Sequence, residues 1–543
     1  MVFARRSTTL LAAIIASCAM VLSLTACTSD NKTVVDGQTT VTSNSAGGVA
    51  VFTPSDGITL NQQTPLNKWA KLVPDLAKAL ADAGFKKGDI NHTTSDSLDK
   101  QSRAIQDFVV DHLSNNTTDD SGIAIAPDNM TLLVAPVVEA DASTRQYGDY
   151  VSQNLSTNDV TDEGATSDGE SSEDDSSKDD SSNTESDSTA SDEQAQAVDR
   201  LVSSLKLAKE SGMHVVLLGN SIEGYKPDAF VKFSDAQTIG KLQAEKMVSK
   251  LKLDKASKDN PKYIEVLLPY TAVDEKGNAN DSTFAQEAFR GIWQVLGSYY
   301  QKGVVESPSG TLDGKSTEND WQAVAYDAAK EGSTAKVLDK RLAKTDGQST
   351  LTRIDGIITM NDYIASEVVK ELDDLGYTGS AADINPQITI SGIVGNITGK
   401  KDLSRDAVPD PIKSPENDNA NDSSSSDDDA DEDTSASDKD RDSQWPLVTG
   451  YGAYVSNIPS IVNGKQWMTG MEDRQTIATD IAQACAKLNK DEALNSMPSI
   501  RSSEVGGVKK IPTISEPLLA VSASNLKSAL IDPGYISLAD AGL

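Results

Sequence analysis

Short apolar runs alternate with longer amphipathic windows along most of this 543-residue chain. The runs at residues 48–52, 130–136 and 214–218 are typical of buried strands, and residues 90–93 predict another. Residues 69–83 and 98–113 carry apolar side chains at helical spacing, and a further helix is predicted to begin near Thr144 and to resume over 195–211. Because parallel strands need crossover connections, the alternation predicts an α/β fold.

The same pattern restarts after Gly224. It predicts strands at residues 230–233, 263–268, 303–305, 354–360, 387–394 and 446–449, and helices at 238–251, 283–299, 321–342 and 363–375. Two successive doubly wound, Rossmann-like lobes joined by a hinge are the simplest account. In such sheets ligands bind outside the carboxyl ends of the strands, so a cleft between the two sets of strand ends is the expected site.

Two acidic tracts interrupt the pattern and hold most of the net charge of −33. Fourteen acidic residues and one lysine lie between Asp159 and Glu193, and twelve acidic with two basic residues lie between Glu416 and Asp442. These Ser/Asp-rich tracts have too few apolar side chains to offset the entropy of ordering, so disordered insertions are expected at about 155–194 and 405–444. No basic face is clustered for phosphate contacts, which argues against nucleic-acid binding.

The start of the chain predicts export. Arg5 and Arg6 precede an apolar run at 10–24 that is short for a membrane span. The run ends in Leu-Thr-Ala-Cys at 24–27, which resembles the lipobox of bacterial lipoproteins and implies cleavage before Cys27 and acylation of its thiol. We therefore expect a lipid-anchored protein at the outer face of the cytoplasmic membrane. An ordinary secretory peptide or a plain N-terminal anchor is the alternative.

Cysteine and histidine usage bounds the chemistry. Cys485 is the one free cysteine expected after removal of residues 1–26 and acylation of Cys27, so neither a disulfide nor a cysteine zinc site is expected. Its sequence context predicts a small apolar residue on a helix. The three histidines form no metalloprotease motif, and no nucleophile elbow, P-loop or dinucleotide fingerprint stands in a supporting context. We expect no enzyme, no catalytic residues, no cofactor and no metal, although a surface glycoside hydrolase stays as a disfavoured alternative.

Several stretches, in their order and spacing, resemble one family. They are residues 212–222 with 233–245, residues 354–362, residues 448–454 with 464–469, and residues 510–517 with 525–535. Together they resemble the type I periplasmic binding proteins, in the xylose-binding and multiple-sugar-binding branch, over nearly all of 47–543 outside the inserts. The resemblance implies two lobes that close on a sugar and, when closed, dock on the permease of an ABC importer. It also implies a monomer.

The expected domain boundaries follow from this reading. They are a signal peptide at 1–26, a flexible tether at 27–46, an N-terminal lobe at 47–222, a C-terminal lobe at 223–465, a return to the N-terminal lobe at 466–505, and a C-terminal lobe tail at 506–543.

The resemblance also supplies candidate ligand-binding residues, because carboxylates and amides pair with adjacent hydroxyls and aromatic rings pack on the apolar face of a sugar. They are Lys68, Trp69, Asn220, Asn280, Asp281, Asn361, Asp362 and Tyr451. For Trp69 simple burial is the alternative. For Asn361 and Asp362 the alternative is capping of the helix that follows, and one can cap while the other binds.

Three positions depart from the family pattern. Gly219 and Asn220 stand where relatives often have Asp-Arg, Tyr451 and Gly452 where they have Gln-Asp, and Glu472 where they have a lysine. These differences remove charged groups and add a ring. They predict a ligand other than the usual monosaccharide, or a ligand-sensing or structural surface lipoprotein whose binding site has degenerated.

Overall fold

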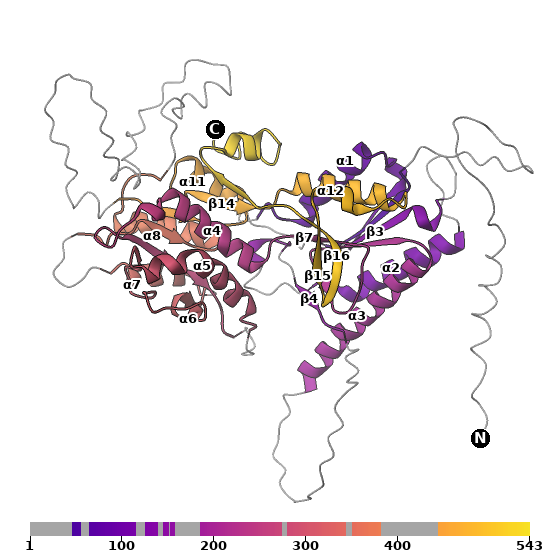
Figure 1. The fold of residues 1–543 in the computed structure, drawn as a ribbon, viewed down its shortest axis with the longest axis horizontal. Helices are drawn as coiled ribbons and strands as arrows, with labels where there is room; N and C mark the ends of the chain where they lie inside the picture. Colours follow the sequence, from indigo (N-terminus) through magenta and orange to yellow (C-terminus); the bar gives the residue numbers. More distant parts are fainter. Residues whose placement is uncertain are drawn as a thin grey trace, which may run out of the picture. The chain divides into compact units, whose positions relative to one another are not determined.

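A computed structural model describes residues 46–55, 65–115, 125–138, 145–150, 153–157, 185–273, 280–328, 330–343, 350–381 and 444–543 (Figure 1). The expected signal peptide, residues 27–45 of the expected tether, residues 158–184 of the first acidic insert, residues 405–443 of the second and the strand predicted at 387–394 lie outside these ranges. The described residues belong to a single unit, Ser45–Leu543. Among them, none of the helices combines the length and the apolar character that a membrane crossing requires.

The first lobe is built on a seven-stranded sheet in the order β15-β16-β7-β5-β3-β1-β2. Its strands are β1 (Gly48–Pro54), β2 (Ile90–Ser95), β3 (Met130–Val134), β5 (His214–Leu218), β7 (Ala229–Lys232), β15 (Ile500–Val505) and β16 (Val508–Ser515). All pairs are parallel except the β15–β16 hairpin. In chain order the five strands before β15 run 2-1-3-4-5, the order of a doubly wound fold.

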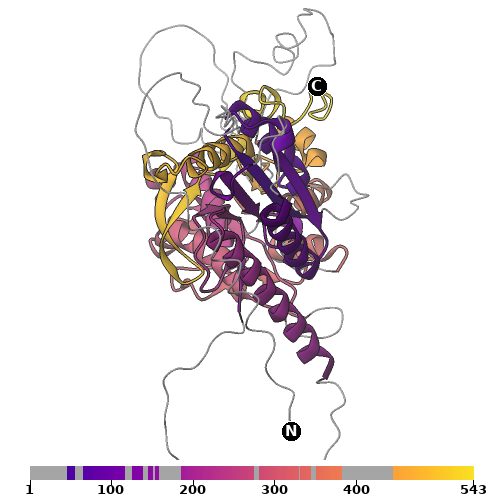
Figure 2. The ribbon, with the colours of Figure 1, turned by 90° about the vertical axis from the view of Figure 1, so that its right-hand side faces the viewer.

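Side chains of this sheet alternate between two apolar layers, because successive strand residues point to opposite faces. Val49 and Val51 of β1 pack with helices α1 (Trp69–Asp82) and α12 (Arg474–Leu488). Ala50 and Phe52 pack with α2 (Leu98–Asn115) and α3 (Glu185–Glu210). Figures 1 and 2 show α2 and α3 side by side. Cys485 is buried in α12, as predicted for a small apolar residue, and burial raises the pKa of its thiol.

The second lobe repeats the same winding in a four-stranded parallel sheet, in the order β10-β8-β12-β13. The strands are β8 (Lys262–Val266), β10 (Val305–Glu306), β12 (Gly356–Ile358) and β13 (Leu447–Thr449), so their chain order is 2-1-3-4. Its helices are α4 (Ala236–Lys250), α5 (Thr283–Gln301), α6 (Trp321–Val324), α7 (Ser333–Arg341), α8 (Asp362–Leu375) and α11 (Ile458–Val462). Among them α4 packs on α5 and α7 packs on α8. The chain is therefore α/β with two doubly wound lobes.

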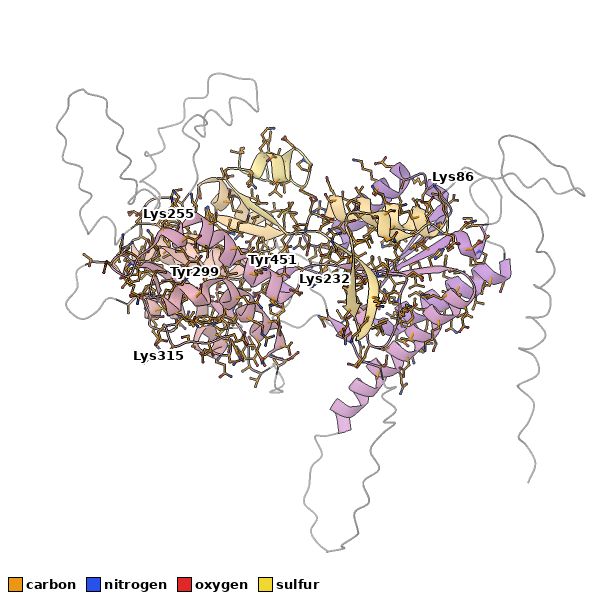
Figure 3. The ribbon with its side chains drawn as sticks, viewed as in Figure 1. Lys86, Lys232, Lys255, Tyr299, Lys315 and Tyr451 are labelled. Atoms are coloured by element: carbon orange, nitrogen blue, oxygen red, sulfur yellow. The ribbon has the colours of Figure 1, made fainter. Side chains whose placement is uncertain are left out.

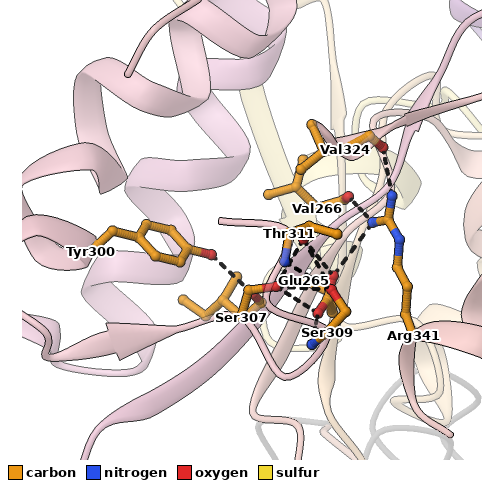
Figure 4. A network of polar contacts seen from close by, with 9 residues as sticks. Glu265, Val266, Tyr300, Ser307, Ser309, Thr311, Val324 and Arg341 are labelled. Carbon is orange, nitrogen blue, oxygen red and sulfur yellow. Dashed lines mark hydrogen bonds and ion pairs between the residues drawn. The ribbon is translucent and has the colours of Figure 1, made fainter. Parts of the chain in front are cut away.

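A buried charge pair fastens α7 to the second sheet (Figure 4). Glu265 of β8 is fully buried and lies 3.4 Å from the guanidinium of Arg341, which also donates to the carbonyls of Val266 and Val324. The carboxylate accepts further hydrogen bonds from the Ser309 backbone (2.8 Å) and from the side chain of Ser307 (2.7 Å). These described partners of the two charges are all internal, which identifies a structural pair.

The chain crosses between the lobes three times. It leaves the first lobe between β7 and α4, returns between β14 (Met468–Met471) and α12, and leaves again between β16 and β17 (Leu519–Ser522). Strands β14 and β17 pair antiparallel at these crossings. The predicted end of the N-terminal lobe at residue 222 is therefore too early, because residues 229–232 extend the first sheet. The predicted end of the return segment at residue 505 is also too early, because β16 belongs to the first sheet.

Four other differences from the sequence prediction have local causes. Where a helix was predicted from about residue 144, the described residues form a 3₁₀ turn at Arg145–Tyr147 that stops before Gly148, which has a φ of +102°. The helix predicted over 321–342 divides into α6, β11 (Ala325–Tyr326) and α7, because β11 pairs with β9 (Leu268–Pro269). Helix α3 begins at Glu185, inside the predicted insert, since an existing helix extends at little cost. The short pair β4 (Asn154–Leu155) with β6 (Ser221–Ile222) was not predicted.

Candidate functional site

Residues at the carboxyl ends of strands from the two sheets meet at the crossings. Ser234 follows β7 of the first lobe, and Tyr451 follows β13 of the second. Their hydroxyl oxygens are 2.6 Å apart, and Figure 3 labels Tyr451 beside the crossing that follows Lys232. The rule for open α/β sheets places ligands at such strand ends. We therefore take the region between the lobes as the candidate site.

Glu472 joins Ser234 and Tyr451 in a buried polar cluster. Its carboxylate accepts hydrogen bonds from the backbone N–H of Ser234 (2.6 Å) and from the Ser234 hydroxyl. Loss of water on burial raises the pKa of Glu472 to about 7, although the bonds from Ser234 oppose the shift. The same burial raises the pKa of the Tyr451 phenol. Glu472 is thus a buried carboxyl group that is easily protonated.

Trp69 begins α1 and is buried under two other rings. Tyr150 meets its ring at 5.0 Å and 67°, and Phe233 at 5.7 Å and 88°. Lys68 pairs with Asp149 at 2.8 Å, and the second oxygen of Asp149 accepts the Trp69 backbone N–H at 3.0 Å. Because Lys68 provides no side-chain cap, Asp149 supplies the anionic group favoured at the start of α1.

Asn361 and Asp362 begin α8 and serve different purposes. Asn361 is the N-cap, whose side-chain oxygen accepts the Ile364 N–H at 2.9 Å, so the capping interpretation of this residue is confirmed. Asp362 is fully buried and accepts hydrogen bonds from the Tyr454 backbone (2.9 Å) and from the side chains of Thr469 (2.8 Å) and Gln466 (2.7 Å). Burial raises its pKa to about 6 in spite of these donors.

The remaining candidates lie at loop ends. Asn220 is buried, accepts the Gln153 N–H at 3.0 Å and donates to the Pro136 carbonyl at 2.9 Å. Asn280 donates to the Thr271 carbonyl at 2.8 Å. Asp281 is exposed at the start of α5 and accepts the Thr283 N–H at 2.9 Å. The described contacts place Trp69, Asn361 and Tyr451 in the region between the lobes. The hydrogen bonds given above for Asn280 and Asp281 join them to residues close to them in sequence.

Sequence reasoning missed the segment that links these residues. We call residues 145–150 the strap. Its Gln146 accepts the Asn361 side-chain N–H at 3.1 Å, and its Tyr147 ring lies 4.7 Å from Phe284 and 6.2 Å from Tyr451. The Tyr-Gly-Asp-Tyr sequence at 147–150 is a turn signal that could have revealed it.

A buried polar group in this region, the side-chain N–H₂ of Asn67, has no hydrogen-bond partner among the described residues. The side-chain oxygen of the same residue accepts the Glu472 N–H at 3.3 Å. Buried polar groups are paired in most native structures, so each such group needs an explanation. Donors, acceptors and rings that converge in this way can bind a small hydroxylated molecule. Within the described ranges, no group of three acidic, His or Cys side chains is placed to hold a metal.

No known family matches the sequence, and no curated protein does. Solved structures with a similar fold include a solute-binding protein of an ABC transporter from Clostridium phytofermentans with bound β-D-glucose (17% identity, 91% of this chain, 99% of that chain, TM-score 0.44). Others are a carbohydrate transporter solute-binding protein from Chloroflexus aurantiacus with D-glucose (18%, 91%, 98%, 0.42) and a periplasmic solute-binding protein from Actinobacillus succinogenes with bound D-allose (9%, 89%, 99%, 0.38). Because these TM-scores are below 0.5, the fold assignment rests on the strand order instead.

Proposed function

We propose that this chain is the extracytoplasmic solute-binding protein of an ABC importer. In this proposal it acts as a monomer, is held at the membrane by lipid on Cys27, and carries a small polar solute, most simply a sugar, between its lobes to a permease. The observation that carries the proposal is the meeting of strand ends from two doubly wound sheets at a polar and aromatic cluster. The side-chain N–H₂ of Asn67, which has no partner among the described residues, supplies hydrogen-bonding capacity for a solute in that cluster.

The three crossings support a hinge mechanism. In the part of the chain that the structure describes, the segments after β7, β14 and β16 connect the lobes covalently, so a few backbone dihedrals can absorb a rotation of one lobe against the other. A solute that contacts both lobes binds the closed state better than the open state, and that difference in affinity drives closure. A permease that contacts both lobes would then distinguish loaded from empty protein.

The binding residues proposed from sequence divide by position. Asn361, Tyr451 and Trp69 would contact the solute, since they lie at the meeting point of the lobes, and Asn67 is added to them. For Lys68, Asn220 and Asp362 we propose support of the site through their internal hydrogen bonds. For Asn280 and Asp281 a direct contact is the least supported.

Calorimetric titration of the protein from residue 28 onward against a panel of mono- and oligosaccharides tests the proposal. We expect saturable one-to-one binding with no turnover of the sugar. In the variant Asn361→Ser the helix cap is kept but the amide donor is lost, so affinity should fall by about tenfold with little change in stability. Asp313→Asn, in an exposed turn outside the cluster and the crossings where the carboxylate accepts the Lys315 N–H at 2.8 Å, is the control and should bind normally. Equal affinity of Asn361→Ser and the parent protein would contradict the site.

One observation favours the second candidate, a ligand-sensing or structural surface lipoprotein. Each of the eight residues proposed from sequence already has internal partners, and Trp69 is covered by two rings. A folded protein that binds nothing across the panel would support this alternative.

A further inference from the structure

The strap contacts both lobes, but it is bound more strongly to the first lobe than to the second. On the first lobe, Asp149 pairs with Lys68 and accepts the Trp69 N–H, while Tyr150 donates from its hydroxyl to the Lys68 carbonyl at 2.5 Å. The Tyr150 ring also stacks on Phe233 at 4.7 Å and 23°. A charge pair, charge-assisted hydrogen bonds and stacked rings make this a firm anchor.

The strap backbone also lies very close to the first lobe. The Asp149 N–H donates to the Asn67 carbonyl at 2.8 Å. A side chain at Gly148 would place its Cβ 2.5 Å from that same carbonyl, and the residue has a φ of +102°. Glycine is therefore required at this point, so that the strap can follow the end of the loop that leads into α1.

The described contacts of Gln146 and Tyr147 with the second lobe are neutral. Gln146 accepts from the Asn361 amide at 3.1 Å through its side chain and from the Tyr454 hydroxyl at 2.6 Å through its backbone carbonyl. Tyr147 is buried in the apolar core of the second lobe beside Phe284. Neutral hydrogen bonds contribute less than charge-assisted ones, so this contact is the weaker of the two.

The groups that the strap occupies are those of the proposed solute site. Gln146 offers acceptor oxygens to Asn361 and Tyr454, as a sugar hydroxyl would, and the Tyr147 ring fills the space next to Tyr451. We propose that the strap is an internal competitor for the solute, which displaces Gln146 and Tyr147 from the second lobe while Asp149 and Tyr150 stay on the first. The identity of the ligand in this inference rests on the proposed function. The expected effect of the strap on the separation of the lobes does not depend on the proposed function.

Competition of this kind lowers the apparent affinity. When only a fraction of molecules have the strap released, the apparent dissociation constant is the intrinsic one divided by that fraction. Two neutral hydrogen bonds and a buried ring are enough to keep the strap bound to the second lobe in about nine or more of every ten molecules. Removal of the strap contacts should therefore strengthen solute binding by about tenfold or more.

The test uses the double variant Gln146→Ala/Tyr147→Ala of the chain from residue 28 onward, with D-glucose and D-allose as probes. Without sugar, we expect a larger radius of gyration in solution scattering and faster amide hydrogen exchange around Tyr454 than in the parent protein. With sugar, we expect the tenfold gain in affinity. Tyr225→Ala is the control, because Tyr225 is a buried tyrosine of the first lobe that lies outside the strap.

The outcomes separate the two proposals. An unchanged radius of gyration and unchanged exchange in the double variant would overturn the strap inference whether or not a sugar binds. A second outcome is that the lobes of the double variant open while neither sugar binds to the variant or to the parent protein. This result would support the strap as a contact that holds the lobes together and would count against the sugar-binding function. Equal effects from Tyr225→Ala would also overturn the inference, because they would show general destabilisation.

Discussion

Glu472 makes the stability of the protein depend on pH in an unusual direction. Its carboxyl is buried against Ser234 and Tyr451, and burial, reinforced by the nearby charge of Asp235, raises its pKa from 4.5 to about 7. The native state therefore holds a proton that the unfolded chain releases between these two pH values. The free energy of unfolding should fall as pH rises through this window, by roughly 3 kcal/mol in total. The contribution of the protonated Glu472 carboxyl to stability is fully present below pH 4.5 and is lost above pH 7.

The variant Glu472→Gln isolates this effect, because glutamine resembles the protonated acid and cannot ionise. In urea unfolding at pH 5, 6, 7 and 8, the variant should gain stability over the parent protein as pH rises, by roughly 3 kcal/mol between the ends of the window. Asp362, whose pKa is raised to about 6, contributes to both proteins and cancels in the difference. Glu492→Gln, at an exposed carboxylate, should follow the parent curve. Parallel curves for Glu472→Gln and the parent protein would refute the reasoning.

Three further substitutions test other parts of the structure. Arg341→Met leaves the buried carboxylate of Glu265 without its charge partner and should cost about 3–5 kcal/mol in urea unfolding; a loss below 1 kcal/mol would contradict a buried ion pair. Gly291→Ala places a methyl 2.0 Å from a backbone carbonyl of α4 and should cost about 1–3 kcal/mol, whereas Gly314→Ala, with only ordinary contacts, should be nearly neutral. Cys27→Ala should abolish incorporation of labelled fatty acid in cells, and retained label would contradict the lipobox interpretation.

The lobes could be predicted from sequence because their strands and helices carry strong local signals. The apolar run at 214–218 is β5, and the amphipathic windows at 69–83 and 363–375 correspond to α1 and α8. Sheet membership of residues 229–232 could not be predicted in the same way. A four-residue apolar strand fits either sheet, and its place is decided by pairing with β5 and β16, which are distant in sequence.

The candidate site was predicted only in part, because its geometry depends on tertiary contacts. The positions of Asn361 and Tyr451 after buried strands were correctly inferred, since strand ends can be read from the apolar pattern. The coverage of Trp69 by Tyr150 could not be inferred, because the two residues are 81 positions apart and the strap has no apolar period. Gly148, with a φ of +102°, ends the 3₁₀ turn at Arg145–Tyr147 and prevents a longer helix there.

Asn67 connects the hinge with the strap, and this gives the molecule a way to couple them. Its side-chain oxygen accepts the Glu472 N–H, and its backbone carbonyl accepts the Asp149 N–H. Its own N–H₂ group is buried and unpaired among the described residues. A solute that accepts a hydrogen bond from this group would contact the same residue that holds both the carboxyl cluster at the crossings and the firm anchor of the strap. Ionisation of Glu472 and release of the strap should therefore act on solute binding through one shared residue.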